Sequence, residues 1–480
     1  MSLLRVVRRP GVGRLGGAGL LSGLADWMLF IALPMYVLRL TGSPLVTATV
    51  FALELVPTVL ASPLAGVLVD RFDPWRLMTA VALLQAGCLL PLLLATSADR
   101  LWLVYLVVVV KSMLGTVIEP CRTTTAARLV PPDELIPVNQ AMGVLSSLAR
   151  LVGGPLGGLL LARYGAHGVV LVTATTFGAV ATFLALRRHH PGATAGRPGP
   201  GATVPGRHDG GTVPGRHDGG TVPAPAGTDP SGRPAPTTRP VREPIHPVRD
   251  WLDGVAVVAR VPVLRRVMGV AGCMALAQGA FVVLFVLFVV RDLGGGESEV
   301  GVLRGVQAIG ALAGGGLLGL VARRTTAGRL VAGALAVFGG LSLVTWNATA
   351  VTTTFGVYVG LFIAAGLPGL ASMTGLFTLL QAHSPDAYRG RVMSAFFAVY
   401  GGVQALGMLL AGLVGTGTGL TVALDAQGAC YLAAAALALR LTTDRQSPGP
   451  GRSRIIMTSR RTPSGMTPTI SPVGRKPARR

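Results

Sequence analysis

Long runs of apolar residues recur along this chain, separated by short polar or charged segments. They lie near residues 15–38, 45–69, 77–95, 101–121, 138–161 and 167–186, and after a long interruption near 265–290, 300–322, 328–346, 351–380, 391–415 and 419–440. A helix needs roughly 20 apolar residues to cross a bilayer. The runs are continuous, whereas the strands of a membrane β-barrel alternate. The pattern predicts an all-α membrane protein with 12 transmembrane helices in two six-helix bundles.

The interruption differs sharply in composition from the runs. It is rich in Pro, Gly, Thr and Arg and holds a tandem nine-residue repeat at 203–211 and 212–220. Such a segment buries too little apolar surface to fold. The repeat contains His208 and His217, which we interpret as parts of a duplicated linker unit and not as metal ligands. We predict an N-terminal bundle at 1–190, a disordered cytoplasmic linker at 191–249, a short amphipathic helix with the C-terminal bundle at 250–441, and a disordered basic tail at 442–480.

Two loops repeat at one offset. Pro132-Asp133 and Pro385-Asp386 lie 253 residues apart, and the same offset places Gly66 on Gly319. Because a single offset relates two separate loops of one half to two loops of the other, we infer that the two bundles are pseudo-symmetric, as in transporters built from parallel repeats.

Composition and charge agree with a membrane protein. The chain is 51% hydrophobic and only 13% charged, against about 25% charged in soluble domains. The net charge of +22 comes from arginines in the tails and in alternate loops, which indicates orientation in a membrane and not nucleic-acid binding. We therefore expect a multi-pass protein of the cell membrane with both termini in the cytoplasm. No cysteine pair has the spacing of metal ligands, and we expect neither metal nor cofactor.

A charged loop follows the second apolar run. Gly66, Asp70, Arg71 and Arg76 stand there in a spacing that resembles the signature between the second and third helices of major facilitator superfamily transporters. Asp73 and Pro74 depart from that signature. The segments 41–43, 119–122 and 390–394 resemble the multidrug-efflux branch that includes macrolide exporters, and 153–158 resembles the antiporter signature with one residue fewer. The resemblance implies a secondary transporter that exports a small compound.

Ionisable residues inside apolar runs are costly and are therefore functional candidates. Asp26, Glu54, Lys111 and Arg150 lie near the middle of four runs, whereas Arg304 and Asp425 lie nearer the ends of theirs. The same offset places Asp26 and Glu54 within one residue of Gln278 and Gln307. Because carboxylates of the N-terminal half thus correspond to neutral amides in the C-terminal half, we expect the N-terminal half to handle protons. We hypothesise that Asp26 or Glu54 carries the coupled proton and that Lys111 or Arg150 tunes it. The alternatives are buried ion pairs that fix helix register, or a water-filled position for Asp26.

The charged loop suggests a cytoplasmic gate. We expect Asp70 to meet the start of the eleventh span near Arg391, where the helix dipole favours an anion, and Glu119 to pair with Arg71 or Arg76. The alternative is a solvated loop that only sets topology. The expected gate residues are Gly66, Asp70, Arg71, Arg76, Glu119, Arg122 and Arg391.

We predict a secondary active transporter that exports a small hydrophobic compound in exchange for protons by alternating access. Its expected partners are that compound, protons and the lipid bilayer, with no nucleic acid, and we expect a monomer. The alternatives are uptake or export of a specific metabolite, and a membrane sensor of the same fold that does not transport. The sequence has no zinc pair, nucleophile elbow or phosphate-binding loop that would indicate an enzyme.

Overall fold

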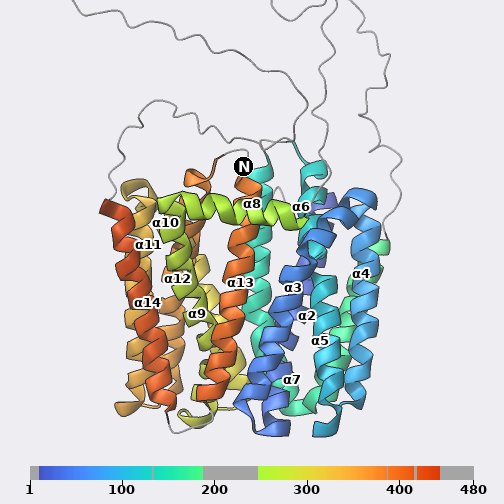
Figure 1. Cartoon of the computed structure of the whole chain (residues 1–480). Coiled ribbons are helices and arrows are strands. Elements are labelled where there is room, and N and C mark those ends of the chain that lie inside the picture. The colour runs from blue at the N-terminus through green and yellow to red at the C-terminus, as the bar shows by residue number, and fades with distance from the viewer. Residues whose placement is uncertain (1–9, 132–133, 187–246, 386–387, 416–418, 444–480) are drawn as a thin grey trace, which may run out of the picture. The chain divides into compact units, whose positions relative to one another are not determined.

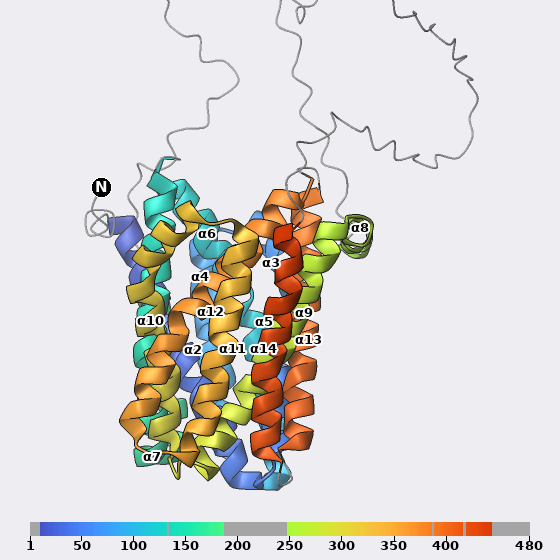
Figure 2. The same cartoon turned by 90° about the vertical axis from the view of Figure 1, so that its left-hand side faces the viewer.

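The computed structural model of the chain describes residues 10–131, 134–186, 247–385, 388–415 and 419–443. The predicted linker and the basic tail lie almost wholly outside these ranges, and the Pro-Asp repeats lie partly outside them. The described residues form helices only, and Figures 1 and 2 show most of them side by side. Those of the N-terminal half are α2 (Pro10–Thr41), α3 (Pro44–Arg71), α4 (Pro74–Leu89), η1 (Leu90–Leu94), η2 (Ala98–Arg100), α5 (Leu101–Gly115), α6 (Ile118–Leu129) and α7 (Leu135–Ala185).

The C-terminal half begins with a helix that lies across the ends of the others. The helices of this half are α8 (Pro247–Arg260), α9 (Pro262–Arg291), α10 (Glu297–Arg324), α11 (Ala327–Asn347), η4 (Ala348–Ala350), α12 (Phe355–His383), α13 (Arg389–Val414) and α14 (Leu420–Thr443). In Figure 1, α8 runs crosswise at the top of the picture. It packs against α13 and α9, and Val257 and Val258 are buried. This helix covers 247–260, where the sequence analysis expects a short amphipathic helix at the start of the segment 250–441. We call this end of the molecule the α8 end.

Nine helical stretches of the described residues are long and apolar enough to cross a membrane. One of them lies in α7, whose 51 residues would span about 76 Å if straight, more than twice the roughly 30 Å of a bilayer core. The chain reverses within it at Gly165, whose φ of 65° and ψ of −171° suit only glycine. The all-α membrane fold is confirmed, whereas the count of twelve spans stays a prediction.

The internal repeat is visible in helix boundaries. Pro44 and Arg71 bound α3, and Glu297 and Arg324 bound α10 exactly one repeat offset later. The turn between α3 and α4 also explains the departure from the family signature. Asp73 caps α4, because its Oδ1 accepts the Trp75 N–H at 2.8 Å and the Arg76 N–H at 3.2 Å, and Pro74 occupies the first helical position, where its missing N–H costs nothing.

The buried residues form three cores. One core belongs to the N-terminal half at the α8 end and contains Val12 and Val138. A second, with Val267 and Val392, belongs to the C-terminal half at the same end. The third and largest lies toward the opposite end and joins residues of both halves. The two bundles are therefore held together at the opposite end and packed independently at the α8 end.

Glycines let the two halves approach closely at the opposite end. A Cβ added to Gly154 of α7 would lie 3.0 Å from the Gly301 carbonyl oxygen of α10. A Cβ on Gly412 of α13 would lie 2.9 Å from Leu45 Cα of α3. Since only a residue without a side chain permits backbones to meet in this way, these glycines set the contact between the bundles.

Candidate functional site

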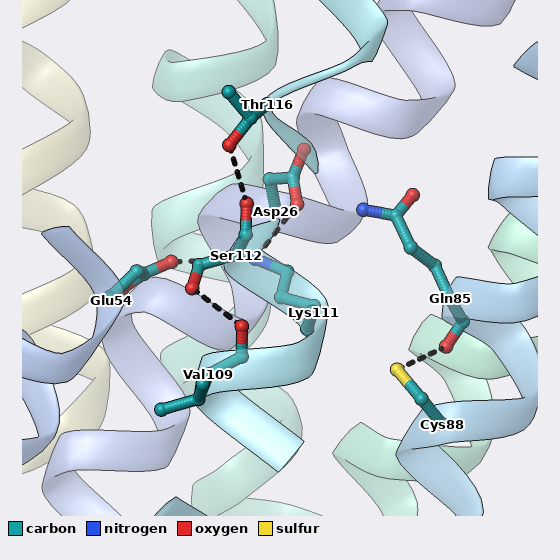
Figure 3. A network of polar contacts seen from close by, with 8 residues as sticks. All are labelled: Asp26, Glu54, Gln85, Cys88, Val109, Lys111, Ser112 and Thr116. Atoms are coloured by element: carbon teal, nitrogen blue, oxygen red, sulfur yellow. Dashed lines mark hydrogen bonds and ion pairs between the residues drawn. The ribbon is translucent and has the colours of Figure 1, made fainter. Parts of the chain in front are cut away.

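Three of the ionisable residues predicted from the sequence meet in the N-terminal half. Lys111 of α5 places its Nζ 2.9 Å from Asp26 Oδ1 of α2 and 3.3 Å from Glu54 Oε1 of α3. Figure 3 shows the ammonium between the two carboxylates. The Lys111 side chain is 9% exposed, against 42% for Asp26 and 29% for Glu54. The amine is therefore buried behind two carboxylates that remain accessible. We call these three residues the charge cluster.

Residues next to the charge cluster keep its surroundings ordered. The Ser112 hydroxyl donates to the Val109 carbonyl at 3.0 Å and the Thr116 hydroxyl to the Ser112 carbonyl at 2.9 Å, both along α5. Gln85 of α4 is buried, and its Nε2 would lie 3.5 Å from a Cβ on Gly115. The α5 backbone that carries Lys111 is thus packed against a polar side chain as well as apolar ones.

The charge cluster lines a cavity between the two halves. This cavity has a volume of about 510 Å³, within the range of small-molecule sites. A neighbouring hollow of about 220 Å³ shares Asp26, Trp27 and Glu119 with it and continues past Arg122 near the α8 end. The lining of the larger cavity is Asp26, Trp27, Phe30, Phe51, Glu54, Leu55, Lys111, Ser112, Gly115, Thr116, Glu119, Val282, Arg304, Gln404 and Met408.

The C-terminal half contributes a second cation to this cavity. Arg304 Cζ lies 5.1 Å from the centre of the Phe281 ring, 5.9 Å from that of Phe30 and 6.0 Å from that of Trp27. Its Nη1 donates to Gln307 Oε1 at 3.0 Å. Arg304 was expected nearer the end of its span, but it lines the cavity beside rings of α2 and α9.

The other predicted polar residues have different partners. Arg150 stacks on Trp27 with its Cζ 4.7 Å from the ring centre, and no ion pair joins it to the described carboxylates, so the expectation that it tunes Asp26 or Glu54 is not supported by a contact. Gln278 accepts a hydrogen bond from the Tyr431 hydroxyl at 2.9 Å. Gln278 and Gln307 thus each bind a side chain of their own half.

The predicted gate is only partly described. Glu119 Oε2 pairs with Arg122 Nη1 at 3.0 Å, one turn along α6, and the expected pairing of Glu119 with Arg71 or Arg76 stays a prediction for the conformation in which the cytoplasmic side is closed. Residues three positions apart on one helix lie close enough to pair. The side-chain surroundings of Gly66 and Asp70 lie outside the described residues. Arg391 stacks on Tyr388 with its Cζ 5.4 Å from the ring centre.

Contacts between the halves close the opposite end of the molecule. Arg39 at the end of α2 forms an ion pair with Glu297 at the start of α10. The Glu297 side chain is 3% exposed and that of Arg39 57%. Within the C-terminal half, Arg291 donates from Nη1 to the Gly415 carbonyl at 2.8 Å. The Arg39–Glu297 pair and the glycine contacts thus join the two halves at that end.

Sequence reasoning missed several cavity residues. Gln404 is a polar residue within the apolar run of the eleventh span, a signal that could have identified it. Trp27, Phe30 and Phe51 gave no comparable signal, since aromatic residues in membrane helices serve packing as often as binding. Among the described residues, no group of three His, Cys, Asp or Glu side chains could hold a metal ion.

Comparison with known proteins is consistent with this architecture. The chain is similar to the MFS-type transporter y4rN of Sinorhizobium fredii (24% identity; 84% of this chain and 88% of the relative). Shorter matches are to the MFS-type transporter YfiS of Bacillus subtilis (25% identity; 33% of this chain and 37% of the relative) and to the multidrug efflux pump Tap of Mycobacterium tuberculosis (29% identity; 34% and 40%). These two matches thus span about two fifths of each relative.

The fold itself is found among solved transporters. A crystal structure of a bacterial homologue of the iron transporter ferroportin, in an inward-facing state, superposes with a TM-score of 0.60 at 15% identity, covering 92% of this chain and all of the other. The sequence pattern of the Major Facilitator Superfamily matches residues 15–264 and 267–477. The resemblance inferred from the charged loop is confirmed, and the chain belongs to the major facilitator superfamily of membrane transporters.

Proposed function

We propose that this protein exports a small hydrophobic compound across the cell membrane in exchange for protons, by alternating access of the central cavity. The charge cluster carries this proposal. Two carboxylates and one amine, supplied by three helices of one half, line a cavity that both halves form. Charges inside a membrane protein mark ion and proton pathways.

The composition of the charge cluster suits reversible protonation. With every group charged, Asp26, Glu54 and Lys111 carry one more negative than positive charge, and a single proton makes the cluster neutral. A wet cavity tolerates the charged form, whereas a cavity closed from water favours the neutral form. Opening and closing the cavity would therefore change the proton occupancy of Asp26 or Glu54, and Lys111 would keep the remaining carboxylate paired.

The separate cores at the α8 end support the alternating-access part of the proposal. The shared core and the Arg39–Glu297 pair hold the opposite end closed, while the cavity continues toward Arg122 near the α8 end. Rocking of one half against the other would exchange the open and closed ends. Arg71, Arg76, Arg128 and Arg329 lie at helix ends on the α8 side, and the excess of arginine favours the cytoplasm for that side and for both termini.

The direction of transport is proposed from relatives. Tap is named as a multidrug efflux pump, and the apolar and aromatic lining of the cavity suits a hydrophobic compound. Gly66, Asp70 and Arg391 remain proposed gate residues that would meet when the α8 end closes.

Uptake experiments in cells test this function. Cells that express the full chain are compared with empty-vector cells for accumulation of ethidium, erythromycin and 2-naphthoate, with and without a protonophore. We expect lower accumulation of at least one probe, restored by the protonophore and by the double variant Asp26→Asn/Glu54→Gln. The control Asp425→Asn, whose carboxylate binds Asn347 outside the cavity at 2.8 Å, should export as the wild type does. Export that survives the protonophore, or unchanged accumulation of all three probes, would contradict the proposal.

A further inference from the structure

Arg304 differs from every other cation of the cavity in its partners. Lys111 faces two carboxylates and Arg122 faces Glu119. Arg304 has no carboxylate within ion-pair distance among the residues that the structure describes, and its hydrogen bond goes to the neutral amide of Gln307. A guanidinium has five N–H donors, so one amide oxygen satisfies only a small part of its capacity.

The position of Arg304 is built by both halves of the protein. The residue lies on α10 of the C-terminal half, beside Phe281 of α9, yet two of its three ring contacts, Trp27 and Phe30, come from α2 of the N-terminal half. Ring faces attract a cation electrostatically and keep the guanidinium in place, but they do not neutralise its charge. The positive charge therefore lies at the cavity wall, where both halves contribute to its surroundings.

Aromatic and apolar side chains surround this charge. Trp27, Phe30 and Phe51 line the cavity together with Val282 and Met408. Phe30 packs against Trp27 and Phe51 with ring centres 5.1 and 5.3 Å apart. A compound that satisfies Arg304 and also fills this wall needs an anionic group attached to a flat apolar body.

We propose that the cavity binds amphipathic organic anions, with a carboxylate of the ligand on the Arg304 guanidinium and its aromatic body against Trp27, Phe30 and Phe51. The planar fork of arginine matches the two oxygens of a carboxylate. Lys111 is already paired with the two carboxylates of the charge cluster, whereas Arg304 lines the cavity with only an amide as its hydrogen-bond partner. This inference deepens the proposed transport function by naming the ligand class, and the binding itself does not require transport.

Direct binding tests the ligand class without relying on a variant. Full-length wild-type protein in lipid nanodiscs is titrated with 2-naphthoate and with its neutral amide, 2-naphthamide, by calorimetry. Charge-assisted hydrogen bonds predict that the carboxylate binds at least about tenfold more tightly than the amide. Equal affinities, tighter binding of the amide, or binding of neither probe would overturn the proposal.

Variants then locate the anion site. Arg304→Gln should remove the preference for 2-naphthoate, and Arg304→Lys should keep part of it, because the charge remains but the fork is lost. The matched control is Arg163→Gln, which removes the same charge from an exposed position of α7 and should keep the full preference. If Arg304→Gln retains a tenfold preference, the site lies elsewhere and the proposal fails.

The outcome separates the ligand class from the transport function. A carboxylate preference that depends on Arg304, in a protein that exports no probe from cells, would keep the anion site and refute the transport proposal. Protonophore-sensitive export of ethidium with no preference for 2-naphthoate would keep the transport function and refute the anion site.

Discussion

Replacing Gly301 by alanine should shift the protein away from the described conformation. Gly301 of α10 faces α7 of the other half, and an added Cβ would lie 2.9 Å from the Gly154 carbonyl carbon and 3.1 Å from Pro155 Cα. Carbon atoms in contact prefer about 3.5 Å or more, and the Gly154 carbonyl oxygen lies closer still, so α7 and α10 would have to separate by at least about 0.6 Å. The atoms in the way belong to helix backbones and cannot turn aside.

The expected size follows from overpacking. Inserting a methyl group into a close-packed site costs typically about 1–3 kcal/mol, which changes the ratio of two conformations by about 5- to 150-fold. The gain in helix propensity from glycine to alanine, about 1 kcal/mol, applies to both conformations and cancels. The clash acts only while the end opposite α8 is closed, so the variant should favour the conformation in which that end is open.

Spin-label distances provide the assay. Nitroxides at the exposed positions Ala98 and Val351, at the ends of η2 and η4, report the separation of the halves at the end opposite α8. The longer distances should gain population in Gly301→Ala. The control is Gly315→Ala on the same helix, where nothing lies within 4 Å of the added Cβ. Distance distributions that are identical in Gly301→Ala and Gly315→Ala would refute the reasoning.

Three further changes test individual contacts. Lys111→Met leaves the carboxylates of Asp26 and Glu54 without their shared cation. The free energy of unfolding should fall by roughly 1–3 kcal/mol, which is less than for fully buried pairs because both carboxylates are partly accessible. A melting temperature equal to that of the wild type would count against the ion pairs. Glu297→Gln breaks the pair with Arg39, whose side chain is 57% exposed, so the open population should rise less than about fivefold, and a larger rise in the spin-label assay would contradict this. Asp73→Ala removes the cap of α4 and should cost about 1 kcal/mol, whereas Asp73→Asn should cost little; equal losses in thermal unfolding would argue against capping.

The membrane fold was predictable because the bilayer imposes it. Apolar runs of spanning length can only become helices there, and the observed bounds of α9, α10 and α13 lie within a few residues of the predicted runs. The bounds of α10 repeat those of α3 at the internal offset that the loops indicated. The reversal at Gly165 follows from the short gap between two predicted runs, although the helix continues on both sides of it.

Contacts between distant helices were less predictable. The cost of charge in a membrane identified Asp26, Glu54 and Lys111 as a set, but not that Lys111 contacts both carboxylates. The same rule ranked Arg150 above Arg304, because it considers depth along a span and not which face of the helix meets the cavity.

Uphill transport in a purified system tests the central claim that the charge cluster couples protons to export. Full-length protein is reconstituted in liposomes with an imposed pH gradient, and accumulation of whichever of the three probes cells export is followed. The account predicts that the wild type concentrates the probe, and that Asp26→Asn/Glu54→Gln only equilibrates it. Gradient-driven accumulation by the double variant at the wild-type level would contradict the account.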